Sequence, residues 1–344
     1  MIINKKYISI LSLAIAILLC ACSSDNPEVQ TVSAEAQPVG GDIQVMAYAP
    51  PFANTDPTDG PAGFYAYRPD KTTNMGIYML SGGAAIKEER ITYNNNKWHA
   101  YFDVAANTSY TVYGYMPKMG NMSSSLTDVT ENAAKLTITG IKPVTTEDIC
   151  IITGVRDSKE GLKEGNFNWY WPIGDENYSI HLLMDHLYAA VQFHMVIDED
   201  YALLRTIKLK TMTLSTDKGS VNATITLTHN NTGASPVSSV EYSASGSSDA
   251  VVVFNSDEGE ALDTTTPLVI GACFAPTLSE NLTMVTTYDV YDRKNNLIRK
   301  NCTATNKLPN LDAVRAQQVQ LNLTVNPTYL NVLSDPDLDN PTVK

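Results

Sequence analysis

Short segments in which apolar and polar residues alternate run through most of this chain. The clearest segments are 191–197, 221–227 and 319–325. Apolar side chains recur at every second position, so an extended segment has one apolar face and one polar face. Within 206–214 the alternation shifts phase, which predicts a β-bulge near Lys210. These patterns predict β-strands with one buried face each.

Helical patterns are scarce in the sequence, whereas turn residues are frequent. Only 201–205 and 311–318 have a pattern that fits a short helix. Runs of Asn, Asp and Gly occur at 94–96, 229–233 and 292–296 and favour turns. Short strands separated by frequent turns are typical of β-sandwiches rather than of a parallel sheet. We therefore expect an all-β fold.

The N-terminus has the pattern of an export signal. Two lysines precede a short apolar run at 7–19, which is too brief to span a bilayer comfortably. Cys22 follows the small residue Ala21, and signal peptidases need a small side chain before the cut. We therefore expect 1–21 to be a lipoprotein signal peptide and Cys22 to be the lipidated residue, whose acyl chains anchor the protein at a membrane surface. The alternative is an ordinary secretory signal.

The rest of the chain divides into four predicted parts. Residues 22–41 are small and polar and predict a flexible tether. A stretch rich in Trp, Pro and Gly around 169–175 interrupts the strand pattern. It predicts a boundary between a first β-sandwich at 42–175 and a second at 176–327, each of ordinary domain size. Residues 328–344 form an appended tail.

Charge and cysteine content exclude some classes of protein. The chain has 24 basic and 37 acidic residues and a formal net charge of −13, which argues against nucleic-acid binding. After Cys22, the remaining cysteines are Cys150, Cys273 and Cys302, too few for a disulfide framework. A disulfide between Cys273 and Cys302 and buried free thiols both remain open.

The sequence lacks recognisable catalytic and cofactor motifs. His181 and His186 are five residues apart, which places them on opposite faces of a strand. Asp185 is adjacent to His186 and cannot bond to it through side chains in a regular strand. The acidic tail segment 335–340 lacks the Gly and Glu of a calcium-binding EF-hand loop. We therefore expect no metal, no cofactor and no catalytic residues.

Aromatic residues are concentrated in the first half of the chain. They are Phe64, Tyr65, Tyr67, Trp98, Tyr101, Phe102, Tyr110, Tyr113, Tyr115, Trp169, Tyr170 and Trp171. Aromatic clusters on β-sandwiches either pack in the core or form platforms for sugars. Core packing is the favoured interpretation. If the aromatic residues form a sugar platform instead, the alternative function is that of a monomeric surface lipoprotein that binds glycan. Among the functions considered for this chain, an enzyme of unrecognised type ranks last.

Several segments, in this order along the chain, carry a family resemblance. Residues 110–117 (Tyr-Thr-Val-Tyr-Gly-Tyr-Met-Pro) are similar to a first-domain strand with the pattern Tyr-x-x-Tyr-Ala-Tyr-x-Pro. Residues 185–193 resemble a His-Leu-x-Ala-x-Val-x-Phe strand that opens the second domain, and 204–209 match the strand that follows it. The tail at 327–335 is also similar to that of some members. The family is that of the fimbrillin-like proteins, subunits and accessory proteins of the type V pili of Bacteroidia.

The resemblance implies two transthyretin-like β-sandwiches in tandem, in a lipoprotein of the outer membrane and cell surface. It also implies assembly with other pilus subunits, identical or different, and a role in adhesion to a host or bacterial receptor. In donor-strand exchange, a terminal strand of one subunit completes the sheet of the next. The candidate donor residues are Val319, Leu321, Leu323, Val325, Tyr329 and Leu330. Alternatively, 319–325 is simply the last strand of its own domain.

The sequence departs from the family in its processing site. Stalk subunits of this family are cut by a trypsin-like protease after an early Arg or Lys. Here the first basic residue after Cys22 is Arg68, and Pro69 behind it hinders cleavage; Lys71 is next. The departure favours an uncut anchor or accessory subunit, or a member that is cut elsewhere.

Overall fold

The structure is a computed structural model that describes most of the chain. The described residues are 41–53, 65–66, 74–82, 84–88, 90–95, 97–171, 178–230, 232, 234–246, 250–276, 282–308 and 313–326. Residues 1–37 and 38–344 are separate units, and the described residues all belong to the second. The predicted signal peptide, Cys22 and the candidate residues Arg68, Lys71, Tyr329 and Leu330 lie outside the described residues.

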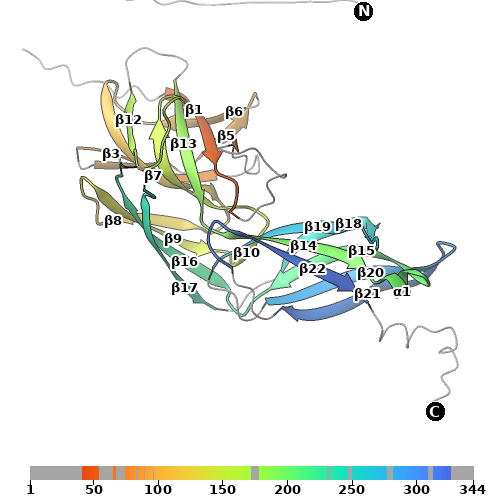
Figure 1. Ribbon diagram of the computed structural model, residues 1–344. Coiled ribbons are helices and arrows are strands. Elements are labelled where there is room, and N and C mark those ends of the chain that lie inside the picture. The colour runs from red at the N-terminus through yellow and green to blue at the C-terminus, as the bar shows by residue number, and fades with distance from the viewer. Residues whose placement is uncertain are drawn as a thin grey trace, which may run out of the picture. The chain divides into compact units, whose positions relative to one another are not determined.

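The first half of the chain supplies most of a ten-stranded sheet, which we call sheet I. Its strands are β1 (Gly41–Ala49), β2 (Tyr65–Ala66), β3 (Asn74–Ser81), β4 (Ala84–Glu88), β5 (Thr92–Asn94), β6 (Lys97–Phe102), β7 (Thr108–Lys118), β11 (Cys150–Arg156), β12 (Asn168–Trp171) and β13 (Ser179–His186). The strand order is β4-β3-β7-β11-β13-β1-β6-β5, with β12 paired to β7 and β2 paired to β1. Figure 1 shows β13 beside β1, with which it pairs in parallel.

Eight of the described strands, seven of them in the second half of the chain, form a β-sandwich of two four-stranded sheets. Sheet III contains β10 (Val144–Thr145), β14 (Ala189–Ile197), β19 (Leu268–Phe274) and β22 (Gln318–Val325), in the order β10-β19-β14-β22. Sheet IV contains β15 (Arg205–Ser215), β18 (Val251–Ala261), β20 (Leu282–Asp292) and β21 (Leu297–Leu308), in the order β18-β15-β20-β21. Alternate apolar side chains of the two sheets, such as Phe193 and Leu209, share one buried core.

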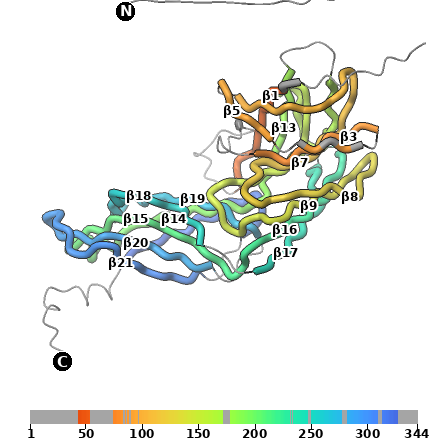
Figure 2. The backbone as a smooth tube through the Cα atoms, turned by 180° about the vertical axis from the view of Figure 1, so that it is seen from behind, coloured from red at the N-terminus to blue at the C-terminus, as the bar shows by residue number. Residues whose placement is uncertain are grey.

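A fourth sheet, sheet II, combines strands from distant parts of the chain. It contains β8 (Ser123–Thr127), β9 (Ala133–Ile141), β16 (Ser220–Thr228) and β17 (Val237–Ser245), in the order β17-β16-β9-β8. Leu136 of β9 lies opposite Ile225 of β16. Both side chains pack with Tyr113 and Tyr115 of sheet I. Sheet II therefore covers one face of sheet I, as Figure 2 shows from behind.

The second face of sheet I has its own core, so central strands of this sheet are buried on both sides. In β11, Cys150 and Ile152 belong to one core, whereas Ile151 belongs to the core shared with sheet II. A strand that is covered on both faces reads as a continuous apolar run rather than as an alternation. This is why β11 lacks the period-2 pattern that marks β14 and β16.

The all-β fold predicted from the sequence is confirmed, as are its clearest strands. The segments 191–197, 221–227 and 319–325 lie in β14, β16 and β22. The predicted bulge is present, because the pairing of β15 shifts register between Leu209 and Thr211. The helix expected at 201–205 begins earlier, as α1 (Glu199–Ala202), where the Asp198 side chain accepts a hydrogen bond from the Tyr201 amide.

The second expected helix is not formed in its described part, since 313–317 make a turn that leads into β22, whose first residue is Gln318. The tandem arrangement with a boundary near 175 stays a prediction. Two pairings bear on it: β13 follows that boundary but lies in sheet I, and β9 and β16 pair across it. No helix among the described residues is long and apolar enough to cross a membrane.

Candidate functional site at the strand junction

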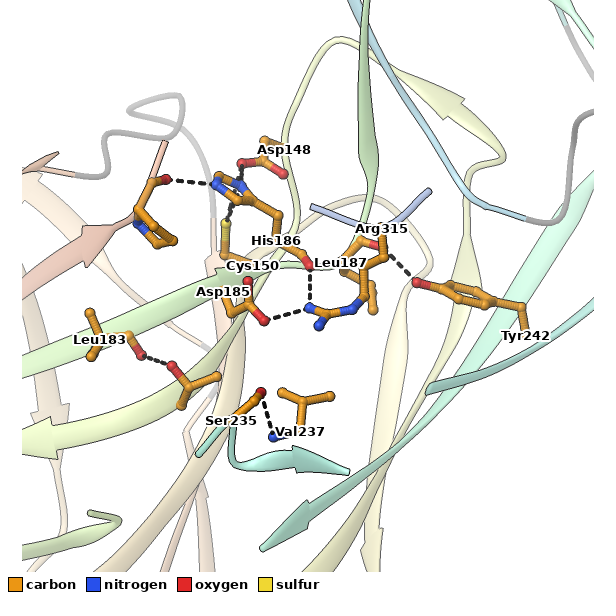
Figure 3. Close-up of polar contacts among 12 residues, drawn as sticks. Asp148, Cys150, Leu183, Asp185, His186, Leu187, Ser235, Val237, Tyr242 and Arg315 are labelled. Carbon is orange, nitrogen blue, oxygen red and sulfur yellow. Dashed lines mark hydrogen bonds and ion pairs between the residues drawn. The ribbon is translucent and has the colours of Figure 1, made fainter. Parts of the chain in front are cut away.

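Polar side chains from several elements form hydrogen bonds at the connection between sheet I and sheet III. Strand β13 ends at His186 and β14 begins at Ala189, so Leu187 and Tyr188 join the two sheets. The Tyr188 hydroxyl donates to the Lys142 carbonyl at 2.8 Å, and the Tyr188 carbonyl accepts from the Ala316 amide at 2.8 Å. Figure 3 shows how polar side chains converge on this junction from separate elements.

His186 is the buried centre of the junction, with 1% of its surface exposed. Its Nδ1 lies 2.6 Å from Asp148 Oδ2, and its Nε2 lies 2.8 Å from the Pro50 carbonyl oxygen. A carboxylate and a carbonyl both accept hydrogen bonds, so each ring nitrogen faces an acceptor, and this arrangement favours the doubly protonated, positively charged imidazole. Burial alone would lower the pKa of His186, but Asp148 and the Pro50 carbonyl outweigh burial and raise it.

Cys150 completes this cluster without the properties of a nucleophile. Its Sγ lies 3.3 Å from Asp148 Oδ2 and 3.6 Å from His186 Nδ1. Burial, followed by the nearby Asp148 carboxylate, raises the pKa of Cys150 well above its usual value, so the thiol keeps its proton. In a catalytic triad the acid and the nucleophile contact different ring nitrogens. Here both face Nδ1, so the cluster does not form a catalytic triad.

The same three side chains offer a possible metal-ligand set. The Asp148 oxygen, Cys150 sulfur and His186 Nδ1 lie within 4.8 Å of one another, and such donors suit Zn²⁺. Two ligands on one zinc ion would lie roughly 3.3 Å apart, because each metal–ligand bond is about 2 Å long. The observed 2.6 Å between oxygen and nitrogen is a hydrogen-bond distance. The geometry is therefore that of a buried ion pair.

Arg315 and Tyr242, from later parts of the chain, donate hydrogen bonds to main-chain carbonyl groups of the junction. Arg315 Nη1 donates to Asp185 Oδ2 and, at 2.9 Å, to the His186 carbonyl. The Tyr242 hydroxyl donates to the Leu187 carbonyl at 2.6 Å. Figure 3 shows Arg315 between Asp185 and the main chain of His186. As predicted, Asp185 and His186 do not bond to each other through their side chains but bind different partners.

The four residues after β1, which we call the strap (residues 50–53), contact both His186 and the start of β22. Besides the bond to the Pro50 carbonyl, the Phe52 ring stacks on the His186 ring with centroids 3.7 Å apart. The Ala53 amide donates to the Ala316 carbonyl at 2.8 Å, and the Ala53 carbonyl accepts from the Gln318 amide at 2.8 Å. The strap therefore links the end of β13 to the first residue of β22.

Strand β22 carries the candidate donor residues that the structure describes. Val319, Leu321, Leu323 and Val325 are half-buried against the sandwich core, whereas Gln320, Asn322 and Thr324 are exposed. β22 pairs in parallel with β14 through its whole length and ends the strand order of sheet III. This pairing agrees with the alternative that 319–325 is the last strand of its own domain. Donation to another subunit stays a prediction.

The apolar face of β22 is only partly covered by its own sandwich. Near its end a groove of about 300 Å³ separates it from sheet IV, lined among others by Met195, Met284, Tyr288, Leu308 and Leu323. These residues belong to both sheets of the sandwich. The sandwich is therefore open on the side where β22 and β21 form its edges.

The remaining cysteines are not paired. Cys150, Cys273 and Cys302 are free thiols, so the disulfide considered between Cys273 and Cys302 is not formed. Cys273 is a buried free thiol in sheet III, which is the second of the two alternatives considered from the sequence. Cys302 on β21 is partly exposed. The two strands belong to opposite sheets of the sandwich.

Most aromatic residues of the predicted cluster are core residues. The buried members are Trp98, Phe102, Tyr110, Tyr113, Tyr115, Trp169 and Trp171. Tyr101 and Tyr170 are exposed, at 56% and 48%, and lie on β6 and β12, which do not pair. Phe64 and Tyr67 lie outside the described residues, and only the backbone of Tyr65 is described. A continuous aromatic platform for sugar is not formed by the described residues.

The sequence singled out His186 and Asp185 but missed their partners. Asp148, Arg315 and the strap are separated from the junction by long stretches of chain, and sequence spacing alone cannot reveal such contacts. Asp148 offers one weak signal, because a carboxylate directly before a continuous apolar run such as 149–152 is placed at the edge of a core. A buried charge of this kind needs a partner.

Comparison with known proteins gives distant likenesses to solved structures. No family model and no curated protein matches this chain. It is similar to solved structures of a candidate cell adhesion protein from Bacteroides uniformis (13% identity, TM-score 0.37, covering 84% of this chain and 95% of that one) and another from Bacteroides ovatus (11%, 0.39, 83% and 92%). It is also similar to a fimbrial protein from Bacteroides vulgatus (13%, 0.33, 83% and 95%). With such scores, these likenesses do not by themselves assign a function.

Proposed function

We propose that this chain is a structural or accessory subunit of a cell-surface pilus and joins other subunits by donor-strand exchange. Before cleavage, acyl chains on Cys22 hold it at the outer membrane, and it takes part in adhesion to a host or bacterial receptor. The order of the sequence motifs supports the family, and the edge position of β22 is the observation that carries the mechanism.

The edge strands of the sandwich differ in their protection against pairing with other chains. Exposed edges usually carry charges or bulges that block the addition of a strand. On β18 and β21 such charges are present: Asp257, Glu258 and Glu260 on the first, and Arg299, Lys300 and Lys307 on the second. The pairings of both strands also shift register. By contrast, β22 has no charge, no proline and an uninterrupted register with β14.

A matching acceptor would form if β1 were removed. β1 lies between β13 and β6 in sheet I. Its side chains Ile43, Val45, Ala47 and Ala49 are buried at every second position in one core. The donor candidates Val319, Leu321, Leu323 and Val325 have the same spacing, which a groove that accepts alternate side chains requires. Cleavage after Arg68 or Lys71 would separate β1 from the rest of the chain.

Limited digestion with trypsin tests this proposal. The chain from residue 23 onward is digested briefly, the product is identified by intact mass, and unheated samples are run on denaturing gels. A ladder of multimers is expected after cleavage at Lys71, since Pro69 hinders cleavage after Arg68. The double variant Arg68→Gln/Lys71→Gln is expected to give no ladder. Trimmed protein that stays monomeric at high concentration would overturn the assembly mechanism.

Two substitutions on β22 test the identity of the donor. Leu321→Asp places a charge on the half-buried face and is expected to abolish the ladder. Asn322→Asp places the same charge on the exposed face and should leave the ladder intact. Because Leu321→Asp also loosens the sandwich, Tyr329→Asp in the tail serves as a second donor variant. Urea unfolding of the monomers shows whether each variant is folded.

Lipidation of Cys22 is tested separately in a bacterial host of the Bacteroidia. Cells are labelled with a radioactive or alkyne-bearing palmitate, and the protein is recovered from the outer-membrane fraction. The wild-type chain is expected to carry the label, whereas Cys22→Ser is expected to carry none and to leave the membrane fraction. An unlabelled wild-type chain with an ordinary cleaved N-terminus would contradict the anchor.

A further inference from the structure

The strap connects the two strands that donor-strand exchange would move. It follows β1 directly in the chain, and its last residue, Ala53, forms a parallel bridge with Gln317. Ala53 makes one hydrogen bond to Ala316 and accepts one from Gln318. The start of β22 is therefore clamped between β14 on one side and the strap on the other.

The strap is itself held by the buried ion pair. Pro50 accepts a hydrogen bond from His186, and Phe52 stacks on the same ring. The His186 carbonyl in turn accepts from Arg315, which lies in the turn that leads into β22. One charged imidazole thus holds the strap through its side chain and the approach to β22 through its main chain.

We infer that the strap locks β22 into its own subunit and that removal of the N-terminal segment unlocks it. The inference rests on the proposed function, since it concerns how that function is regulated. The strap lies between β1 and the candidate cleavage residues Arg68 and Lys71, so one cut releases β1 and the strap together. Opening of the acceptor groove in sheet I and release of the donor strand then follow from the same event.

The order of the main-chain groups on β22 shows what the strap controls. In a parallel strand, both main-chain groups of one residue point to the same side, and successive residues alternate. The Gln318 amide points to the strap, whereas the Val325 carbonyl accepts from Asp198 at the end of β14. Gln320, Asn322 and Thr324 therefore share the outward side with Gln318. The strap covers the first position of this outward row, at Gln318. Separation of β22 from its own sandwich would begin at this end.

Hydrogen–deuterium exchange of 318–325, followed by mass spectrometry, measures the lock directly. In Ala53→Pro the donor to Ala316 is lost, and in Phe52→Ala the stacking on His186 is lost. Loss of one or two such contacts is expected to make exchange in β22 roughly 5- to 30-fold faster. Exchange in β16 and β20 should stay unchanged. The matched control is Tyr170→Ala, which removes an aromatic side chain that is 48% exposed and remote from the strap in sequence.

Trypsin-trimmed protein, stripped of the released N-terminal segment, provides the second measurement. Faster exchange in 318–325 of the trimmed protein, with the uncut chain protected, supports the lock. Equal exchange in the uncut chain, the trimmed protein and both strap variants overturns it. A ladder that forms with unchanged exchange in β22 would overturn the lock and leave the proposed function standing. Faster exchange without a ladder would support the lock and overturn donor-strand assembly.

Discussion

Replacing Asp148 with Asn separates the charge of the His186 cluster from its shape. In the native protein His186 donates from Nδ1 to Asp148 and from Nε2 to Pro50, which requires the charged imidazolium. An Asn amide at position 148 can donate to Nδ1 of a neutral ring instead. That ring keeps its Nε2 proton for the Pro50 carbonyl. The variant therefore preserves both hydrogen bonds of the ring and loses the ion pair, together with the weak hydrogen bond from the Cys150 thiol to Asp148 Oδ2.

The magnitude follows from the strength of the two kinds of hydrogen bond. A bond involving charged groups contributes about 1.5–3 kcal/mol, and one between neutral groups about 0.5–1.5 kcal/mol. Asp148 is 18% exposed and His186 is 1% exposed, so solvent screening of the pair is small. We expect Asp148→Asn to lower the free energy of unfolding by about 1–2 kcal/mol at pH 6.

The difference should depend on pH in one direction. The pKa of His186 is raised in the folded protein. Its contribution is therefore complete below the unfolded pKa of about 6.5 and is lost as pH rises through the higher folded value. Above that value the native ring is neutral, and one of its two nitrogens, now without a proton, faces an acceptor. The folded variant, whose ring is neutral over this pH range, lacks the ion pair and so has no such contribution to lose.

Urea unfolding of both proteins from pH 6 to pH 9 at constant ionic strength measures the difference. We expect the variant to be less stable at pH 6 and equally or more stable at pH 9. Burial lowers the pKa values of His181 and His229, but both titrate in the same way in the two proteins and cancel in the difference. A difference that is constant with pH, or that grows as pH rises, would refute the charged state assigned to His186.

Two further predictions concern backbone strain and thiol exposure. Gly165 has a φ of +79°, and a Cβ there would overlap the Asn230 carbonyl. Gly165→Ala should therefore lower the free energy of unfolding by about 2–4 kcal/mol. Gly271→Ala, which has open space around it, should change it by about 0.5 kcal/mol or less in the same urea titration. Brief alkylation of native protein should modify the partly exposed Cys302, and the buried Cys150 should react only after unfolding, as peptide masses would show.

The sequence predicted those strands that have one dry face and one wet face. β14 and β16 show a strict alternation of buried and half-buried residues, and this alternation is what the sequence displays. β7 carries Tyr113 and Tyr115 into one core and Val112 and Met116 into the other. Its apolar residues therefore follow no period of two, and the sequence could not show which faces are covered. The bulge in β15 was predictable because it changes the alternation itself.

The polar contacts of the junction could not be predicted, because each joins residues that are far apart in the chain. Asp148 and His186 are 38 residues apart, and Pro50 and His186 are 136 apart. Alternation along a strand reveals which side is buried but not which strand lies beside it. Burial of a His side chain therefore implies that it has hydrogen-bond partners, but only the folded structure identifies which residues they are.

The strand pairings lead to a last prediction about the boundary expected near residue 175. A fragment of residues 42–175 would lack β13, whose Ile180, Leu182 and Met184 lie in the core of sheet I between β11 and β1. It would also lack β16, the partner of β9, so the apolar face that both share with sheet I would be open to water. Each large buried side chain that loses its cover costs about 1.5–3 kcal/mol, which exceeds the stability of an ordinary domain after a few such losses. We expect this fragment to show no cooperative unfolding transition in urea, unlike the chain from residue 41 to 326. A fragment that unfolds cooperatively would show that the first half folds without its later strands.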